Sequence, residues 1–385
     1  MSKRIVLFQS INTLKAKRGP HFFFPMFFRD YQHAEHQENE LWYLIKTDDA
    51  ERLKSILYGF QVPLDRVMIL KTRNHRFKTL HERLDMRLAL IRLKPELFHV
   101  LTYASEEELS LLEEAQKRIK RLLFTVTYNA IPMAFSRDDE SRYKRDREKY
   151  GRLFREIKFK GILSWYDDIP AFMAAQDWIN PKPEVAVIDS RYCDATRFSP
   201  AENKKKQIVF ASAFAPYKQP GMFVDAIISL FESGFDFAEW KFLMVGKGPE
   251  EAKIKAKIDA SALGELVEFL PPTEDISPLL NASMAYISCQ DHENFPSLAM
   301  NEAMAAGNAI IARPVGRTHL FVHHEENGYI AEEDSVAGLA LAIKRFISLS
   351  DEDRSKMMKF SHQLTKDYHT PERFRQQVDA FWSKQ

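Results

Sequence analysis

The chain lacks the features that mark disulfide-stapled, membrane-spanning or nucleic-acid-binding proteins. It has two cysteines among 385 residues, Cys193 and Cys289, and their wide separation argues against a disulfide or zinc framework. Its 55 Lys and Arg residues nearly balance 54 Asp and Glu residues, so the overall charge gives no reason to expect a nucleic-acid partner. No apolar run approaches the roughly 18–20 residues that a membrane span needs.

The start of the sequence also lacks a targeting pattern. Residues 1–4 lead directly into a short strand-like run and do not resemble a secretion signal. We therefore expect a cytoplasmic protein. At 45% hydrophobic and 12% aromatic residues, it has enough apolar side chains for substantial cores, and its length suggests two domains.

Short β-rich runs alternate with amphipathic helical stretches, a pattern typical of α/β proteins with parallel sheets. The first series of predicted strands is Ile5–Gln9, Leu41–Ile45, Val67–Leu70, Leu97–Thr102, Leu122–Thr127 and Gly161–Ser164. The second series is Val185–Ile188, Gln207–Ala211, Lys241–Val245, Leu266–Leu270, Ala285–Ser288, Asn308–Ala312 and Gly328–Ile330. Neither internal repeats nor low-complexity segments interrupt this pattern.

Residues 293–307 are the most informative stretch, because they combine a turn, a helix start and a glycine stop. Pro296 suits the first helical position, where its missing N–H would be unbonded anyway. Asn294 or Ser297 can cap the helix, and Gly307 can end it in a left-handed turn. This pattern predicts a short helix that leads into the next strand.

The same helix has a pattern that favours a nucleotide-sugar ligand. A free helix N-terminus beside a strand end is a ready phosphate site, to which the amides of Phe295–Leu298 would contribute. Glu302, less than two turns into the helix, is placed to reach a neutral diol beyond that phosphate. Phosphate and diol together indicate a nucleotide sugar, although a capping turn and a solvated carboxylate are the simpler readings of these residues.

This segment resembles the donor-site signature of the family 4 retaining glycosyltransferases, in which two glutamates bracket a Phe-Pro or Phe-Gly turn ahead of an Ala-Met-Ala-x-Gly helix. The matching residues are Glu293, Phe295, Pro296, Glu302, Ala303, Met304, Ala305 and Gly307. Eight residues separate the two glutamates, whereas the usual pattern has seven. Either the turn is one residue longer, or Asn294 takes the place of the first glutamate.

The resemblance implies the GT-B architecture, with two Rossmann-like domains facing a cleft. Phe198-Ser-Pro resembles the interdomain connector of the family, so we place the domain boundary near residue 200. An acceptor-side domain would span 1–199, and a nucleotide-sugar domain would span 200–365. The segment 366–385 would form a helix that crosses back to the first domain, as in the family.

A departing diphosphate needs relief of its charge, and Lys218 is the candidate for this catalytic role. The segment 212–218 resembles the family's Gly-Arg-x-x-x-x-Lys element, with Lys218 at the lysine position. Ser212 and Ala213 replace the glycine and the arginine, so one phosphate-binding cation is missing. We consider Arg313 or Arg317 as substitutes, and an ordinary loop lysine is the alternative reading of Lys218.

Further candidates border the same predicted nucleotide pocket. Gly246 and Gly248, after the strand Lys241–Val245, resemble the family's pocket-lining loop, although Gly-x-Gly after a strand is weak by itself. Pro271 corresponds in order to the region beside the base. Glu293 is kept as a catalytic candidate on its match to the first glutamate of the signature.

The first domain matches the family less closely. Gly19 lies where the family has a glycine-rich loop that touches the donor phosphate. His99 is a candidate catalytic pocket histidine, because residues 94–100 resemble a Lys-Pro-Asp-x-x-His-x strand; a structural strand-end histidine is the alternative. Tyr128 stands where the family has a histidine that contacts the donor sugar. The aromatic run 21–28 is read as a buried face in preference to an acceptor platform.

The resemblance implies transfer of a sugar to a glycan or lipid-linked acceptor, with no metal ion or other cofactor required. Residues 137–160 hold ten Lys and Arg but six Asp and Glu, and their apolar residues fall near helical spacing. This segment is read either as a solvated helix or as a peripheral contact with the inner membrane face. Two rivals remain open: a binding or scaffold subunit without catalysis, favoured by Ala213 and Tyr128, and a different GT-B reaction.

Overall fold

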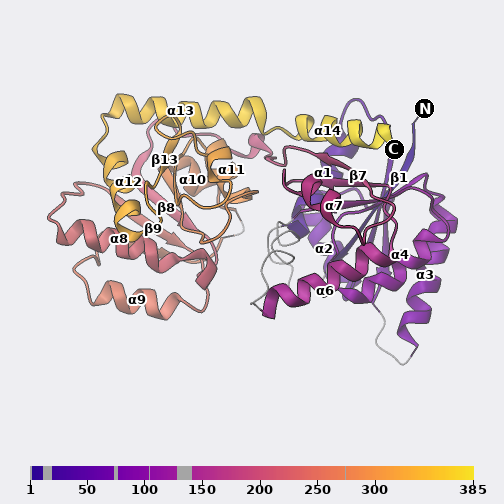
Figure 1. Ribbon diagram of the computed structural model, residues 1–385. Helices are drawn as coiled ribbons and strands as arrows, with labels where there is room; N and C mark the ends of the chain where they lie inside the picture. Colours follow the sequence, from indigo (N-terminus) through magenta and orange to yellow (C-terminus); the bar gives the residue numbers. More distant parts are fainter. Residues whose placement is uncertain (1, 12–19, 73–76, 104, 128–140, 274) are drawn as a thin grey trace. The chain divides into compact units, whose positions relative to one another are not determined.

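The computed structural model describes residues 2–11, 20–72, 77–103, 105–127, 141–273 and 275–385. The chain forms two compact units, each built on a parallel sheet with flanking helices (Figure 1). The first unit comprises Met1–Asp189 and Phe374–Gln385, and the second comprises Ser190–Arg373. The division falls about ten residues before the expected boundary near residue 200. Within the described ranges, no helix is long and apolar enough to span a bilayer.

The first sheet has seven parallel strands in the order β3-β2-β1-β4-β5-β6-β7. The strands are β1 (Arg4–Ile11), β2 (Glu40–Thr47), β3 (Val67–Lys71), β4 (Leu97–Val100), β5 (Leu122–Val126), β6 (Gly161–Ser164) and β7 (Glu184–Val187). All six strands predicted for the first series are present. Val185–Ile188, which the sequence analysis placed in the second series, is instead β7 and pairs with β6. Strand partners are set by the tertiary fold, so the residues of an isolated strand do not reveal them.

Helices connect the strands of the first unit. The described helices are α1 (Pro20–His33), α2 (Ala50–Gly59), α3 (Lys78–Leu93), α4 (Leu109–Gln116), α6 (Ser141–Glu156), α7 (Ile169–Ala175) and α14 (Pro371–Lys384), with 3-10 turns η1 (Leu64–Arg66) and η2 (Glu106–Glu108). The side chain of Asp49 caps α2 by accepting from the amides of Glu51 and Arg52. As expected for the run 21–28, the aromatic residues of α1 from Phe23 onward are buried.

The second sheet has six parallel strands in the order β10-β9-β8-β11-β12-β13. They are β8 (Lys205–Ala211), β9 (Lys241–Val245), β10 (Val267–Leu270), β11 (Ser283–Ser288), β12 (Ala309–Ala312) and β13 (Gly328–Ile330). The remaining six predictions of the second series match these strands. Most of their central residues are buried, as expected for parallel strands covered on both faces.

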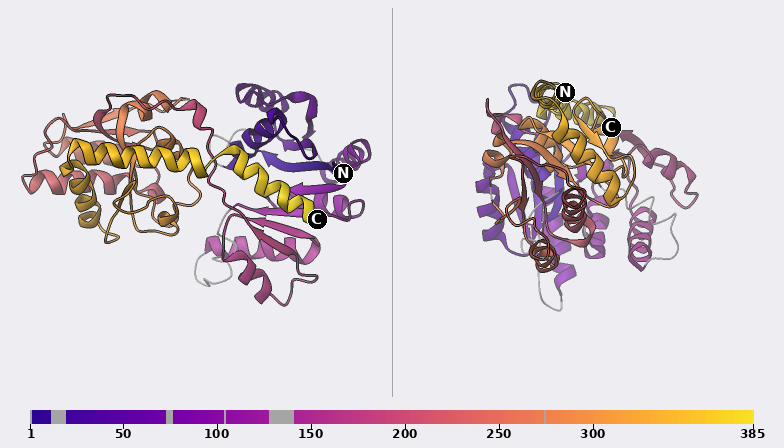
Figure 2. Two further views of the ribbon diagram at one scale, coloured as in Figure 1. Left: turned by 90° about the horizontal axis from the view of Figure 1, so that it is seen from above. Right: turned by 90° about the vertical axis from the view of Figure 1, so that its left-hand side faces the viewer.

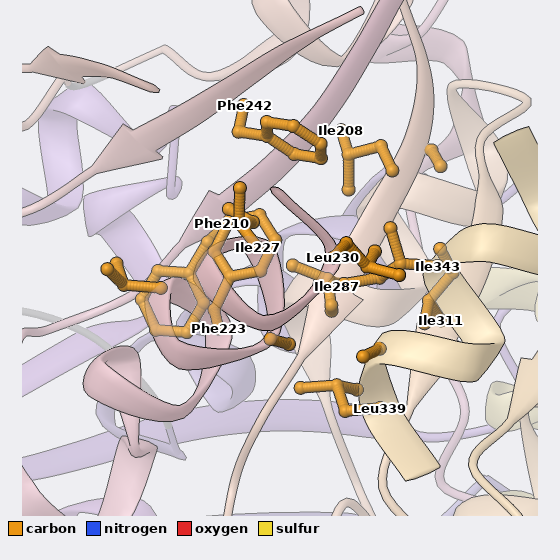
Figure 3. Close-up of a cluster of buried hydrophobic side chains, with 14 of the residues drawn as sticks. Ile208, Phe210, Phe223, Ile227, Leu230, Phe242, Ile287, Ile311, Leu339 and Ile343 are labelled. Carbon is orange, nitrogen blue, oxygen red and sulfur yellow. The ribbon is translucent and has the colours of Figure 1, made fainter. Parts of the chain in front are cut away.

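The helices of the second unit enclose one aromatic-rich core. They are α8 (Pro220–Glu232), α9 (Glu251–Asp259), α10 (Ser277–Ala282), α11 (Leu298–Ala305), α12 (Val336–Ser348) and α13 (Asp351–Tyr368), with η3 (Ala195–Arg197), η4 (Pro216–Lys218) and η5 (Thr318–Leu320). Figure 3 shows Phe210, Phe223 and Phe242 gathered with aliphatic residues of β11, β12 and α12. This core fixes the sheet whose loops carry the predicted donor site.

Helix α14, which follows α13 in the chain, packs on the sheet of the first unit (Figure 2). Trp382 is fully buried, and its indole N–H donates to Nδ1 of His99 at 2.9 Å. Nε2 of His99 therefore carries the proton and donates to the hydroxyl of Thr125 at 2.7 Å. The carboxylate of Asp379 accepts from the hydroxyl of Tyr31 at 2.8 Å. The last helix is thus an integral part of the core of the first unit.

The apolar stripe of helix α6 is buried inside the protein. Tyr150, Phe154 and the following Ile157 are buried, and the ring of Phe154 lies 5.8 Å from that of Phe124 on β5. The charged residues Lys144 and Arg145 are exposed. The segment 137–160, in its described part, matches the reading of a solvated helix that packs one apolar stripe.

We expect Trp382→Ala to destabilise the first unit by about 3–5 kcal/mol, because it leaves a large cavity and removes the hydrogen bond to His99. Denaturant unfolding followed by tryptophan fluorescence measures this, since Trp42, Trp165 and Trp178 remain in that unit. The matched control is Phe360→Ala on α13, where the side chain is 37% exposed and the cost should stay below about 1 kcal/mol. Equal losses in the two variants would contradict the packing of α14 described above.

Burial lowers the pKa of His99 from 6.5 to about 3. Between these pH values the unfolded chain binds a proton that the folded chain excludes, so the free energy of unfolding falls as the pH falls. The slope from this one group is at most about 1.4 kcal/mol per pH unit. Urea unfolding of the wild type and of His99→Gln at pH 7, 6 and 5 should show a weaker pH dependence in the variant. Parallel curves would show that His99 is not the group responsible.

Candidate active site

The order of strands in the second sheet reverses between β8 and β11. From β8 the chain adds β9 and β10 on one side, and then returns to place β11, β12 and β13 on the other. Loops that leave such a position diverge, and open α/β sheets bind their ligands in the crevice between them. Of the sequence candidates, Lys218 follows β8, Gly246 and Gly248 follow β9, Pro271 follows β10, and residues 293–298 follow β11. The structure therefore gathers them at one edge of the sheet.

Lys218 is held at the junction of the β8 and β11 loops. Its amine donates to the side-chain oxygen of Gln290, and the amide of Gln290 donates to the carbonyl of Glu293. The ring of Tyr217 lies 5.3 Å from the amine, and the carbonyl of Tyr217 accepts from the amide of Asp291 at 3.1 Å. Burial lowers the pKa of Lys218, and nearby Asp291 opposes that effect. The amine of Lys218 is thus held in a fixed position by the side-chain oxygen of Gln290. An oxygen of a diphosphate can take the place of this acceptor.

The carboxylate of Glu293 is turned into the protein. It accepts from the amide of Phe295 at 3.0 Å and from the amide of Arg317 at 2.6 Å, and it pairs with the guanidinium of Arg317 at 3.1 Å. A Cβ atom on Gly316 would collide with this carboxylate, and Gly316 has a positive φ of 49°. Glu293 therefore joins the β11 loop to the turn after β12.

Asn294 and Phe295 anchor the same loop from within. The amide oxygen of Asn294 accepts from Ser288 at 2.7 Å, and its amide nitrogen donates to Thr318 at 2.6 Å. The ring of Phe295 packs 5.8 Å from that of Phe321. Both side chains are buried, so only their backbones are available to a ligand.

Helix α11 begins one step later than the sequence pattern predicted. Ser297 is the cap, since its hydroxyl accepts from the amide of Met300 at 3.2 Å, whereas Pro296 precedes the cap and is not the first helical residue. Asn294 does not cap the helix because its side chain is used in the loop. Within the described ranges, the amides of Leu298 and Ala299 have no protein acceptor. These two donors are the groups a phosphate at the helix N-terminus would use.

The far end of α11 is fixed as predicted. Gly307 has a φ of 69°, the left-handed conformation expected at a helix stop. The amine of the neighbouring Lys204 lies within 3.3 Å of four carbonyl oxygens, among them those of Asn281 and Ala306. Burial lowers the pKa of Lys204 to about 7. Lys204 thereby ties the C-terminal ends of α10 and α11 together.

Glu302 faces an arginine that sequence analysis did not single out. Arg197, in η3, approaches the carboxylate of Glu302 to 3.4 Å and that of Asp275 to 3.9 Å. The Glu302 side chain is 16% exposed and that of Arg197 is 39% exposed. Arg197 directly precedes the Phe198-Ser-Pro match to the interdomain connector, and this was the one sequence signal for it. A diol bound at Glu302 would share the carboxylate with Arg197.

The two glycines after β9 allow close packing of adjacent loops. A Cβ atom on Gly246 would collide with the carbonyl of Ser212, and one on Gly248 with the carbonyl of Phe214. The amide of Phe214 donates to the carbonyl of Lys247 at 3.0 Å. The glycines therefore shape the β8 loop that carries Lys218. Pro271 lies exposed after β10.

The two arginines considered as substitutes for the missing cation are already engaged. Arg313 pairs with Asp334 at 2.6 Å and donates to the carbonyl of Cys289 at 2.9 Å. Arg317 is paired with Glu293 as described above. Neither is available to a phosphate without breaking a contact of the loop scaffold.

One Asp-x-Asp spacing, a pattern that binds metal ions in some glycosyltransferases, is present in the sequence at Asp351–Asp353. Asp351 pairs with Arg354 at 2.5 Å, and the amide of Asp353 donates to the hydroxyl of Ser350 at 3.1 Å. These are contacts of a capped helix start. Among the described residues, no cluster of three His, Cys, Asp or Glu side chains has metal-site geometry.

The candidates of the first unit are not brought to an open site. His99 is 1% exposed, and both ring nitrogens are used inside the core, which favours its structural reading over a catalytic one. Gly19 and Tyr128 lie outside the described residues. The first sheet reverses its strand order between β1 and β4. Near that point, the hydroxyls of Ser10 and Thr102 have no hydrogen-bond partner among the residues that the structure describes, a signal that sequence reasoning missed.

The second unit is similar in sequence to known glycosyltransferases. Residues 194–363 match the sequence model of glycosyl transferases group 1. An uncharacterized glycosyltransferase of Haemophilus influenzae is 32% identical over 126 residues, which are 31% of this chain and 35% of that protein. The N-acetyl-alpha-D-glucosaminyl L-malate synthase of Bacillus anthracis is 27% identical over 35% of this chain and 34% of its own length. The matches thus span about a third of these curated relatives.

Solved structures extend the likeness to the whole chain. HepE of Anabaena in complex with UDP and glucose aligns with a TM-score of 0.74 at 14% identity, over 100% of both chains. The pneumococcal O-GlcNAc transferase GtfA aligns with a TM-score of 0.72 at 12% identity, over 100% of this chain and 99% of that one. Two Rossmann-like units with parallel sheets are the GT-B fold, as predicted. Residues 194–363 of this chain are thus similar to the glycosyl transferases of group 1, which confirms the resemblance seen in the sequence.

Proposed function

We propose that this chain transfers a hexosyl unit from a nucleoside diphosphate sugar to an acceptor hydroxyl, with retention of the anomeric configuration. The acceptor would be a bacterial surface glycan or a glycolipid. The observation that carries the proposal is the meeting of Lys218 with the loop that starts α11 at the switch point of the second sheet. A half-buried cation and the N-terminus of α11 are two independent features that favour a bound diphosphate.

The nature of the donor is supported by the similar structures. HepE was solved with UDP, with UDP and glucose, and with UDP-glucose, and GtfA was solved with UDP and GlcNAc. In our proposal the amides of Leu298 and Ala299 and the amine of Lys218 bind the diphosphate. Glu302 binds the ribose hydroxyls, and Pro271 borders the base.

The proposed reaction follows from where charge develops. The bond between the anomeric carbon and the diphosphate oxygen breaks, and a bond from the acceptor oxygen forms on the same face of the sugar. The departing phosphate oxygen takes the proton of the acceptor hydroxyl, so no protein base is needed. Lys218 and the α11 amides stabilise the negative charge on the leaving group. We propose that no metal ion is required, and activity unchanged by a chelator would support this.

In our proposal the acceptor binds to the first unit. The sheet of this unit has its own switch point between β1 and β4. Ser10 lies near the end of β1 and Thr102 lies just after β4, and among the described residues their hydroxyls have no hydrogen-bond partner. A sugar hydroxyl could satisfy such groups, because partnerless polar atoms in a protein are costly.

Anomeric proton couplings of the product, measured by NMR, would show retention or inversion.

Release of nucleoside diphosphate over a panel of nucleotide sugars and acceptors is the primary test of this function. The expected result is turnover with at least one donor, dependent on an acceptor. Tight binding of a nucleotide sugar without release or transfer would favour the scaffold reading, to which the missing arginine at Ala213 points. Absence of binding by every donor would reject both readings.

We expect Lys218→Ala to lower kcat/KM by about ten- to a hundredfold, since a charge-assisted contact is worth roughly 1.5–3 kcal/mol. Steady-state kinetics with saturating acceptor measure this. The matched control is Lys253→Ala on α9, whose side chain is 74% exposed and which should keep wild-type kinetics. A Lys218 variant within twofold of the wild type would remove this lysine from the proposed site.

We expect Glu302→Gln to raise the KM for the donor at least tenfold, because a charged acceptor for the ribose hydroxyls is lost. Arg197→Ala is the companion variant, since it leaves the carboxylate in place while removing its ion pair. If Glu302 acts on the ribose, only Glu302→Gln should weaken donor binding strongly. Similar losses in both variants would mean that Glu302 serves mainly to hold Arg197.

A further inference from the structure

Helix α3 carries a row of large apolar side chains on its solvent face. We call these residues the α3 stripe. They are Phe77 (60% exposed), Leu80 (66%), Leu84 (47%), Leu88 (56%) and Ile91 (53%). Their spacing of three, four, four and three residues places them on one face of the helix. The buried residues of α3 occupy the opposite face, and they are Glu82, Met86, Ala89, Leu90 and Leu93.

The α3 stripe is more than a set of scattered surface leucines. Single exposed apolar residues are normal, but a contiguous row marks an interaction surface. Figure 1 shows α3 on the outside of the first unit. A shallow groove of about 360 Å³ runs beside the stripe, between α3 and the edge strand β3, and Met68, Ile69 and Leu88 line it with Lys71 and Arg92. The apolar surface thus continues from the helix into the groove.

Positive charges surround this surface. Arg87 lies on one flank of the stripe and Arg92 on the other, with exposed Lys71 at the end of β3 and exposed Lys94 after the helix. In the described part of the chain, none of these four cations has an ion-pair partner. Of the two acids of α3, Glu82 is buried against Lys46 at 3.0 Å, and Asp85 lines the groove with Lys71 and Arg92, so α3 sets one carboxylate against four cations.

A second copy of the chain is a poor occupant for this surface. Two facing stripes would bring Arg87 and Arg92 of one copy close to those of the other, and like charges repel. The stripe is also short, about 21 Å at 1.5 Å per residue, which is little for a stable dimer. An anionic lipid surface matches both properties, because apolar side chains enter the boundary of headgroups and acyl chains while arginines reach the phosphates.

We propose that the α3 stripe, with its flanking cations, is the surface through which this chain binds an anionic membrane. In its described side chains, from Lys144 on, helix α6 offers no equivalent face, because its apolar residues Leu153 and Phe154 are buried. Binding through α3 does not depend on the proposed transferase reaction. It is measured without donor or acceptor, so either proposal can fail alone.

Flotation of the full-length chain with lipid vesicles tests this inference. The wild type should float with vesicles of phosphatidylcholine and phosphatidylglycerol and should remain unbound with phosphatidylcholine alone. Leu84→Ser combined with Leu88→Ser should lower the vesicle partition coefficient at least tenfold, and so should Arg87→Glu combined with Arg92→Glu. All four positions are exposed, so the variants should keep the wild-type melting temperature, which is recorded in parallel.

Two matched controls isolate the surface. Tyr58→Ser removes an 80% exposed apolar residue on α2, and Lys144→Glu combined with Arg145→Glu reverses charge on α6. Both controls should bind vesicles like the wild type. The proposal is overturned if the wild type does not bind anionic vesicles. That result is expected if the surface binds an acidic protein instead of a membrane. It is equally overturned if only the α6 variant loses binding to the vesicles. It is also overturned if the α3 variants convert a dimer into monomers without changing flotation.

Discussion

The divergence of two loops at the switch point of the second sheet governs the candidate site. All six strands run parallel, and the order β10-β9-β8-β11-β12-β13 forces the loops after β8 and β11 to part. Close packing then holds each loop in place: Gly246 and Gly248 admit the β8 loop, and Glu293 joins the β11 loop to the turn at Gly316. Lys218 can be held half-buried at the junction because contacts fix both loops. The site is therefore a product of backbone packing as much as of its polar side chains.

Much of this arrangement could be predicted from the sequence, and the remainder shows what local patterns do not contain. Strands with apolar cores and the stop at Gly307 follow from periodicity and backbone preference, which are local properties. Glu302 and Lys218 were found by motif. The partner of Glu302, however, is Arg197, which is 105 residues away, and His99 is bonded to Trp382 across 283 residues. Such pairs are set by tertiary packing, and neither spacing nor composition encodes them.

The errors of prediction have the same origin. Val185–Ile188 has the composition of any buried strand, so its sheet was decided by the neighbour β6 and not by its own residues. Asn294 and Ser297 are equally good helix caps by type, and Ser297 is the cap because Asn294 bonds to Ser288 and Thr318 in the loop. In both cases, a contact made elsewhere in the fold decided the outcome.

The inclusion of α14 in the first unit has a consequence for how the protein is made. The core of that unit contains Phe374, Val378, Phe381 and Trp382 of α14. The whole second unit, Ser190–Arg373, precedes these residues in the chain. During synthesis, domains usually complete their folding in order from the N-terminus. Here the aromatic face of α1 stays exposed until the ribosome has synthesised the second unit and α14 can pack against it. That makes the nascent first unit a natural client for chaperones that shield apolar surfaces.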